Sequence, residues 1–108
     1  MPSPHVNRYA VYVHLADRGK VREPISRKPS FLLAVEGCIS AYQETGHDSY
    51  VIEDRRPERA FTLERRLLLA CVFLRANNRR RYFEVLNQLD RAGDQRLLES
   101  ILADSVPL

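Results

Sequence analysis

The side chains of this chain that could perform chemistry are three histidines, a few serines, two cysteines and a group of arginines. His5, His14 and His47 are widely separated, and none has a carboxylate or thiol at the spacing of a metal-ligand set or a catalytic pair. Ser30 and Ser40 lack the strand-to-helix elbow that a nucleophilic serine requires. The four glycines are not grouped into a loop that could hold phosphate. The sequence therefore predicts a protein that is not an enzyme and that uses no cofactor, metal or small-molecule substrate.

The two cysteines, Cys38 and Cys71, each lie in an apolar segment with helical periodicity, and their spacing does not suit a zinc site. We predict two free, buried thiols that pack as small hydrophobic groups, with a Cys38–Cys71 disulfide as the alternative. The first residues carry no signal-peptide pattern, and the longest apolar run is far shorter than the roughly 20 residues that span a bilayer. These features predict a cytoplasmic protein without a membrane segment.

The arginines include one concentrated basic patch, which comprises Arg75, Arg79, Arg80 and Arg81. Tyr82 follows the patch, and arginine beside an aromatic ring is typical of nucleic-acid contacts. The last three arginines would also begin a helix, where the positive end of the dipole disfavours cations, although an Arg80–Glu84 pair would offset part of this cost. The patch has three interpretations: a solvated charge cluster, a contact with an acidic protein surface, or a contact with nucleic acid.

The composition is that of a globular domain and excludes a polycation. Of the 108 residues 44% are hydrophobic, and 17 basic residues are nearly balanced by 14 acidic ones, which leaves a net charge of +3. A single domain of this size buries only about two-thirds of its unfolded surface. Because dimerisation is one way in which so small a domain gains stability, we expect a homodimer.

One element must organise the rest, because residues 67–74 form the longest apolar run in the chain. On a helix over residues 63–76, one apolar face contains Leu63, Leu67, Ala70 and Leu74, and a second face contains Leu68, Leu69, Val72 and Phe73. A surface helix usually has one such face, so this helix must be covered twice. Either two flanking helices cover it within the monomer, or a second chain covers one face. On the second alternative, Leu69, Val72 and Phe73 contact a partner.

Capping signals predict three further helices around this one. Ser30 begins a helix that Gly46 ends, and Gly37 inside it indicates the close approach of another helix. The other residues that mark helix ends are Thr62 before the central helix, Asn78 and Gly93 around the next one, and Asp94 before the last. The very short turns favour antiparallel or sharply angled neighbours.

Two short runs rich in Tyr, Val and Ile predict β-structure, at residues 8–15 and 49–53. In the first run Tyr9, Val11 and Val13 share one face, which is a second candidate contact surface. The two runs can pair as a small ribbon against the helices. Alternatively, the first run is an irregular arm that becomes ordered only on a partner.

We therefore predict a mainly α fold, a small helical domain of about four helices with a short two-stranded β-ribbon. Residues 1–28 form an N-terminal arm that starts with a loose leader, and residues 29–108 form the helical domain. Two function classes remain, a small protein that binds another protein and a regulator that binds nucleic acid through residues 79–81. The many apolar residues and the small net charge favour the first class.

The size of the chain, its β-rich residues 8–15 and the run over residues 63–81 resemble the small helical antiactivators of bacterial quorum sensing, the QslA type. Members of that family occupy the dimerisation surface of a LuxR-type transcriptional regulator and keep it off DNA. The resemblance implies a bacterial regulatory protein that blocks the association of another protein's subunits and catalyses no reaction. A small basic nucleic-acid-binding regulator is the alternative.

Overall fold

The computed structural model describes residues 8–15, 17, 19–21, 23–55 and 59–105. The described residues form five strands and four helices in the order β1 (Tyr9–Leu15), β2 (Gly19–Lys20), β3 (Ser26–Lys28), α1 (Phe31–Thr45), β4 (Tyr50–Asp54), β5 (Arg59–Leu63), α2 (Arg65–Asn77), α3 (Arg79–Ala92) and α4 (Gln95–Ser105). The leader predicted at the start of the chain lies outside the described residues.

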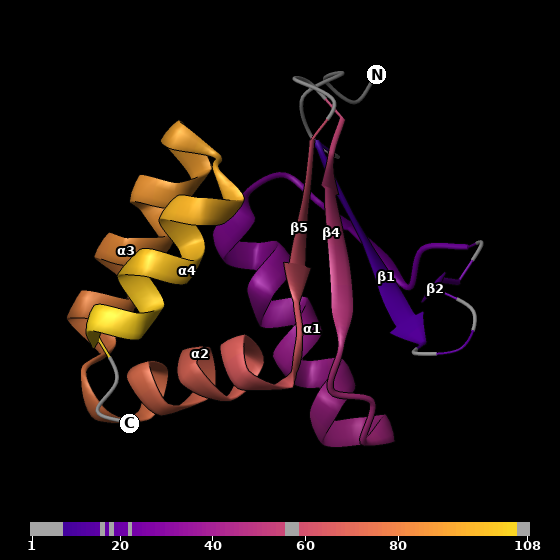
Figure 1. Cartoon of the computed structure of the whole chain (residues 1–108), viewed down its shortest axis with the longest axis horizontal. Helices are drawn as coiled ribbons and strands as arrows, with labels where there is room; N and C mark the ends of the chain where they lie inside the picture. The colour runs from indigo at the N-terminus through magenta and orange to yellow at the C-terminus, as the bar shows by residue number, and fades with distance from the viewer. Residues whose placement is uncertain (1–7, 16, 18, 22, 56–58, 106–108) are drawn as a thin grey trace.

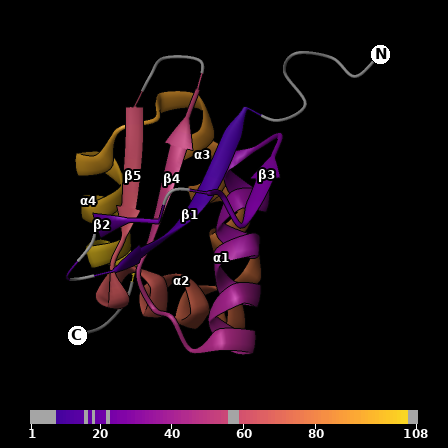
Figure 2. The ribbon, with the colours of Figure 1, turned by 90° about the vertical axis from the view of Figure 1, so that its right-hand side faces the viewer.

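The strands form one antiparallel sheet, so the prediction of a mainly α fold with a two-stranded ribbon is wrong. Four strands lie in the order β2-β1-β4-β5, and β3 also pairs with β1. The four helices lie on one face of this curled sheet, as Figure 1 and Figure 2 show from two directions. The fold is therefore mixed α and β. The sequence did not predict the sheet because its strands pair across segments that are distant in sequence.

Strand β1 lies inside the sheet, and its first three residues are buried. Tyr9 lies opposite Asp54, and the register continues along β4 to Val13 opposite Tyr50. Tyr9 and Val11 are completely buried on the helix-facing side, and Val13 packs against the same core. The strand is therefore held by its neighbours in the sheet and by the helices behind it.

Strands β2, β3 and β5 were not predicted from the sequence, and β5 is the longest of them. Thr62 lies in this strand and does not cap a helix; α2 instead follows Glu64, whose side chain makes no capping hydrogen bond. The Thr62 amide donates to Oε1 of Gln95 (2.8 Å), and the Gln95 side-chain amide donates back to the Thr62 carbonyl (3.2 Å). One side chain of α4 thus replaces the next strand at the outer edge of β5, where unpaired backbone groups would otherwise remain.

Helix α1 begins and ends where its capping residues predict. Ser30 accepts a hydrogen bond from the Leu33 amide, and Gly46 ends the helix with a φ of 82°. Gly37 was predicted to face another helix, and this prediction is wrong. A Cβ at this position would lie 3.2 Å from the Ser26 hydroxyl oxygen of β3. The glycine therefore lets α1 pack closely on the sheet.

Helix α2 packs against the other three helices, and it is the hub that its apolar run predicts. Its buried side chains are Leu67, Leu68, Cys71 and Leu74. Helix α3 is capped by Asn78 and ends at Gly93, and the Asp94 side chain accepts from the Arg96 amide at the start of α4. No helix in the described part of the chain is long and apolar enough to span a membrane.

Candidate functional site

The candidate site begins with two apolar side chains of α2 that the fold leaves exposed. Leu69 is 37% exposed and Phe73 is 40% exposed. The two residues are four positions apart, so they lie one above the other on the same face of the helix. The adjacent Leu68 is completely buried. Helix α2 therefore turns one apolar face inward and keeps another in contact with solvent.

These two side chains border a groove between α2 and α4. The two helices pack against each other (Figure 1). The groove has a volume of about 330 Å³. Its lining consists of Arg66, Leu67, Leu69, Ala70 and Phe73 from α2 and of Glu99, Leu102 and Ala103 from α4. Six of these eight side chains are apolar, so the groove can bury another apolar group.

The α2–α4 groove carries one cation and one anion. Arg66 comes from the first turn of α2 and Glu99 comes from α4, and both are exposed. Within the described part of the chain, neither forms an ion pair. The groove thus combines an apolar centre with two opposite charges at its rim that are available to another molecule.

The other predicted contact residues lie elsewhere. Val72 is partly buried and packs against the core, away from the groove lining. The second predicted contact surface, formed by Tyr9, Val11 and Val13, is wrong as an accessible surface, because this face of β1 meets the helices. Tyr9 and Val11 have no exposed area, and Val13 is partly buried against the same core.

Three of the four arginines in the basic patch lie near a glutamate. A nitrogen of Arg75 lies 3.0 Å from a Glu36 oxygen. Arg80 and Arg81 both pair with Glu84, at 3.4 and 3.9 Å, and the first of these is the predicted i,i+4 pair. Arg79 stacks on the ring of Phe83, with its guanidinium carbon 5.6 Å from the ring centre. The four arginines share two glutamates, so the patch keeps a net positive charge, and the Arg80–Glu84 pair is exposed to solvent.

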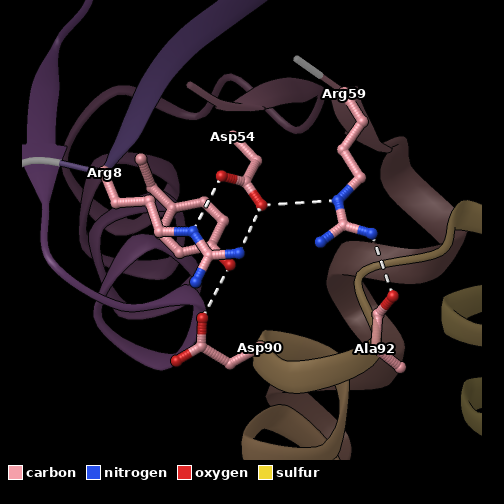
Figure 3. Close-up of polar contacts among 6 residues, drawn as sticks. Arg8, Asp54, Arg59, Asp90 and Ala92 are labelled. Carbon is pink, nitrogen blue, oxygen red and sulfur yellow. Dashed lines mark hydrogen bonds and ion pairs between the residues drawn. The ribbon is translucent and has the colours of Figure 1, made fainter. Parts of the chain in front are cut away.

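A second polar arrangement, the Asp54 cluster, joins β1, β4, β5 and α3 (Figure 3). It consists of Arg8, Tyr9, Asp54, Arg59 and Asp90 together with the carbonyl of Ala92. Arg8 donates to both oxygens of the completely buried Asp54 carboxylate, at 2.8 and 2.9 Å. Arg59 reaches the same carboxylate at 3.4 Å and also donates to the Ala92 carbonyl at 2.9 Å, near the end of α3.

The phenol of Tyr9 completes the Asp54 cluster by donating to Asp90 at 2.6 Å. Burial and the hydrogen bond to Asp90 raise the pKa of Tyr9 well above its ordinary value. The bond therefore holds a neutral phenol against a carboxylate, and the cluster fastens the first strand to the third helix. Its geometry supports a structural role, because each of its charged groups is turned to another part of the chain.

The described histidines and cysteines form no metal site. Within the described ranges, no group of three or more His, Cys, Asp or Glu side chains could hold a metal ion. His14 and His47 lie close together at one end of the sheet, whereas His5 lies outside the described residues. Cys38 and Cys71 are free, buried thiols, as predicted. Burial raises the pKa of Cys71 to about 12, so this thiol stays protonated and unreactive near neutral pH.

Another groove, of about 450 Å³, lies between α1 and strands β1 and β3. Its lining includes the exposed apolar residues Ile25 and Leu33 together with charged and polar residues such as Lys28 and Glu44. This mixed lining favours solvent over a continuous apolar contact. The α2–α4 groove is therefore the better candidate site.

The sequence indicated only the α2 half of this site. Arg66, Glu99, Leu102 and Ala103 were not singled out, because only the packing of α4 beside α2 brings them together. The helical repeat of Leu98 and Leu102 in α4 is a signal of that packing, but it does not identify the neighbouring helix. Comparison of the chain with protein-family models, with curated proteins and with solved structures finds no match.

Proposed function

We propose that this chain is a regulatory protein that acts by binding another protein in the α2–α4 groove and that catalyses no reaction. The observation that carries this proposal is the exposure of Leu69 and Phe73 on the central helix beside an apolar groove. Large apolar side chains are usually buried in the core of a protein. A pair of them exposed beside a groove is typical of a surface that contacts another protein.

The energetics favour the apolar centre of the groove over its charged rim. Complete burial of a Leu or Phe side chain contributes roughly 1.5–3 kcal/mol, so covering the exposed part of Leu69 or Phe73 contributes about 1 kcal/mol each. An exposed ion pair contributes about 0–1 kcal/mol. The apolar residues should therefore determine affinity, and Arg66 and Glu99 should determine orientation and selectivity.

The finer part of the proposal is the kind of partner. The resemblance to bacterial quorum-sensing antiactivators supports a transcriptional regulator of the LuxR type, whose subunits this chain would keep apart. Free thiols at Cys38 and Cys71 support a reducing, cytoplasmic setting. The small net charge of the chain favours this proposal over binding to nucleic acid, and Glu36 and Glu84 offset part of the charge of the basic patch.

The test is to replace Phe73 by Asp and to compare it with Leu33→Asp, a matched change at an exposed apolar residue of α1. We expect Phe73→Asp to weaken capture of a co-expressed LuxR-type regulator at least about tenfold, because a charge enters the apolar contact. It should lower the free energy of unfolding by about 1–2 kcal/mol and leave the chain folded, because the chain itself already covers most of the Phe73 side chain. Leu33→Asp should leave capture unchanged.

Two results would contradict the proposal. The first is equal loss of capture in both variants, and the second is global unfolding of Phe73→Asp by circular dichroism. Binding of the wild type to random duplex DNA, with a steep dependence on salt, would instead support the nucleic-acid alternative.

A further inference from the structure

We propose that the α2–α4 groove is self-complementary and that a second copy of this chain occupies it in a two-fold symmetric dimer. This inference rests on the proposed function, namely that the groove binds a protein, and it names one occupant. Three features of the groove carry it: the placement of its two charges, the presence of both protruding and recessed apolar groups, and its small size.

The charges match a two-fold arrangement. Arg66 lies on α2 and Glu99 lies on α4, so they approach the groove from its two different helices. In a two-fold contact, if residue i of one copy touches residue j of the other, then j also touches i. Arg66 can therefore face the partner copy's Glu99 at one end while the reciprocal pair forms at the other. No such pair forms within one described chain.

The apolar groups also match each other. Leu69 and Phe73 are exposed on the groove, whereas Ala70, which lies between them on α2 and also lines the groove, is small and partly buried. One surface thus carries both large side chains that can insert and the space that receives them. A partner of unrelated sequence would have to supply this combination separately, whereas a second copy supplies it by symmetry.

The size of the groove sets the strength of this dimer. Two exposed apolar side chains and two rim charges on each copy are few beside the roughly 20–30 residues that each side of a standard stable interface contributes. We therefore expect a dimer that dissociates at micromolar concentration. Because dimer and partner would use the same surface, self-association competes with the capture of another protein, and dilution frees the groove for capture.

The experiment is a charge reversal with rescue between two different copies, measured by sedimentation velocity over a range of concentrations. Arg66→Glu alone and Glu99→Arg alone each place like charges opposite one another at both ends of the dimer. We expect each variant to self-associate at least about tenfold more weakly than the wild type. Arg91→Glu, the same change of charge at an exposed position of α3 outside the groove lining, should self-associate as the wild type does.

Mixing the two single variants is the decisive measurement. In the mixed pair both rim contacts again join an arginine to a glutamate, so the mixture should form dimers with the affinity of the wild type. The double variant Arg66→Glu with Glu99→Arg should also regain self-association. A contact made only within one chain cannot be restored by mixing, so this rescue is specific for a contact between copies.

Any of three results would overturn the inference: a wild type that stays monomeric at every concentration tested, single variants that dimerise normally, or a mixture that stays monomeric. A monomeric wild type that still loses partner capture on Phe73→Asp would show that a different protein occupies the groove, and the proposed function would stand. Rescue by mixing without any effect of Phe73→Asp on capture would leave the dimer and remove the proposed function.

Discussion

The Asp54 cluster and the α2–α4 groove differ in where their partners come from. Among the described residues, Arg8 before β1 and Arg59 of β5 compensate the buried carboxylate of Asp54 within the chain. The exposed Leu69 and Phe73 have no such cover, and the nearby Arg66 and Glu99 form no ion pair within the described ranges. The first region is complete in the monomer and therefore serves stability. The second is incomplete, and this is the physical basis for assigning function to it.

The test with the largest expected effect removes the carboxylate at the centre of the Asp54 cluster. Asp54→Ala leaves two guanidinium groups without their carboxylate, and we expect the free energy of unfolding to fall by about 2–3 kcal/mol, as measured by urea denaturation. The expected loss lies below that for a wholly buried pair, because Arg8 and Arg59 are both partly exposed.

The control for this variant is Glu53→Ala, which removes the neighbouring carboxylate on the outer face of the sheet. Glu53 pairs with the exposed Lys20, and its loss should cost less than about 1 kcal/mol. Equal effects of the two substitutions would show that the Asp54 cluster is no more important to the monomer than a surface ion pair.

The next test concerns Gly93, which lies at the end of α3 with a φ of 58°. An added Cβ would come within 2.0 Å of the Arg59 guanidinium carbon, so Gly93→Ala must displace the arginine from the cluster as well as strain the backbone. We expect a loss of about 2 kcal/mol in the free energy of unfolding.

Gly46→Ala is the matched control, because Gly46 also has a positive φ but a Cβ there would meet nothing within 4 Å. Gly46→Ala should lower the free energy of unfolding by about 1 kcal/mol, which is the cost of the backbone conformation alone. The difference between the two glycines measures the packing of Arg59, and identical losses would mean that Arg59 moves aside without cost.

Local signals predicted those parts of the fold that depend on neighbouring residues. The ends of α1 and α3 follow from caps at Ser30 and Asn78 and from left-handed glycines, whose effects act within one turn. The sheet could not be predicted in the same way. The segment of β5 carries a single Thr that resembles a helix cap, and only pairing with β4 and the Gln95 contact make it a strand.

The same distinction applies to the candidate site. Helical spacing placed Leu69 and Phe73 on one face of the central helix, because that face depends on the repeat of one helix. Which face remains exposed depends on where α3 and α4 pack, and the contribution of Glu99 depends on a helix some 30 residues later in the chain. The sequence therefore indicated the apolar half of the groove but not its charged rim.

The smallest test uses the phenol that joins the Asp54 cluster to α3. Burial and Asp90 raise the pKa of Tyr9 above its ordinary value of 10.0, so the folded chain keeps this proton where the unfolded chain releases it. The unfolded state then binds fewer protons, and stability must fall as pH rises above about 10, by about 1.4 kcal/mol per pH unit for one such group. Tyr9→Phe should reduce that slope by this amount in urea titrations above pH 10 and leave it unchanged between pH 7 and pH 8. If the slope above pH 10 is the same in the variant, the phenol of Tyr9 releases its proton equally in the folded and unfolded states. Tyr9 would then not be part of the buried Asp54 cluster but would resemble the exposed side chains of the α2–α4 groove.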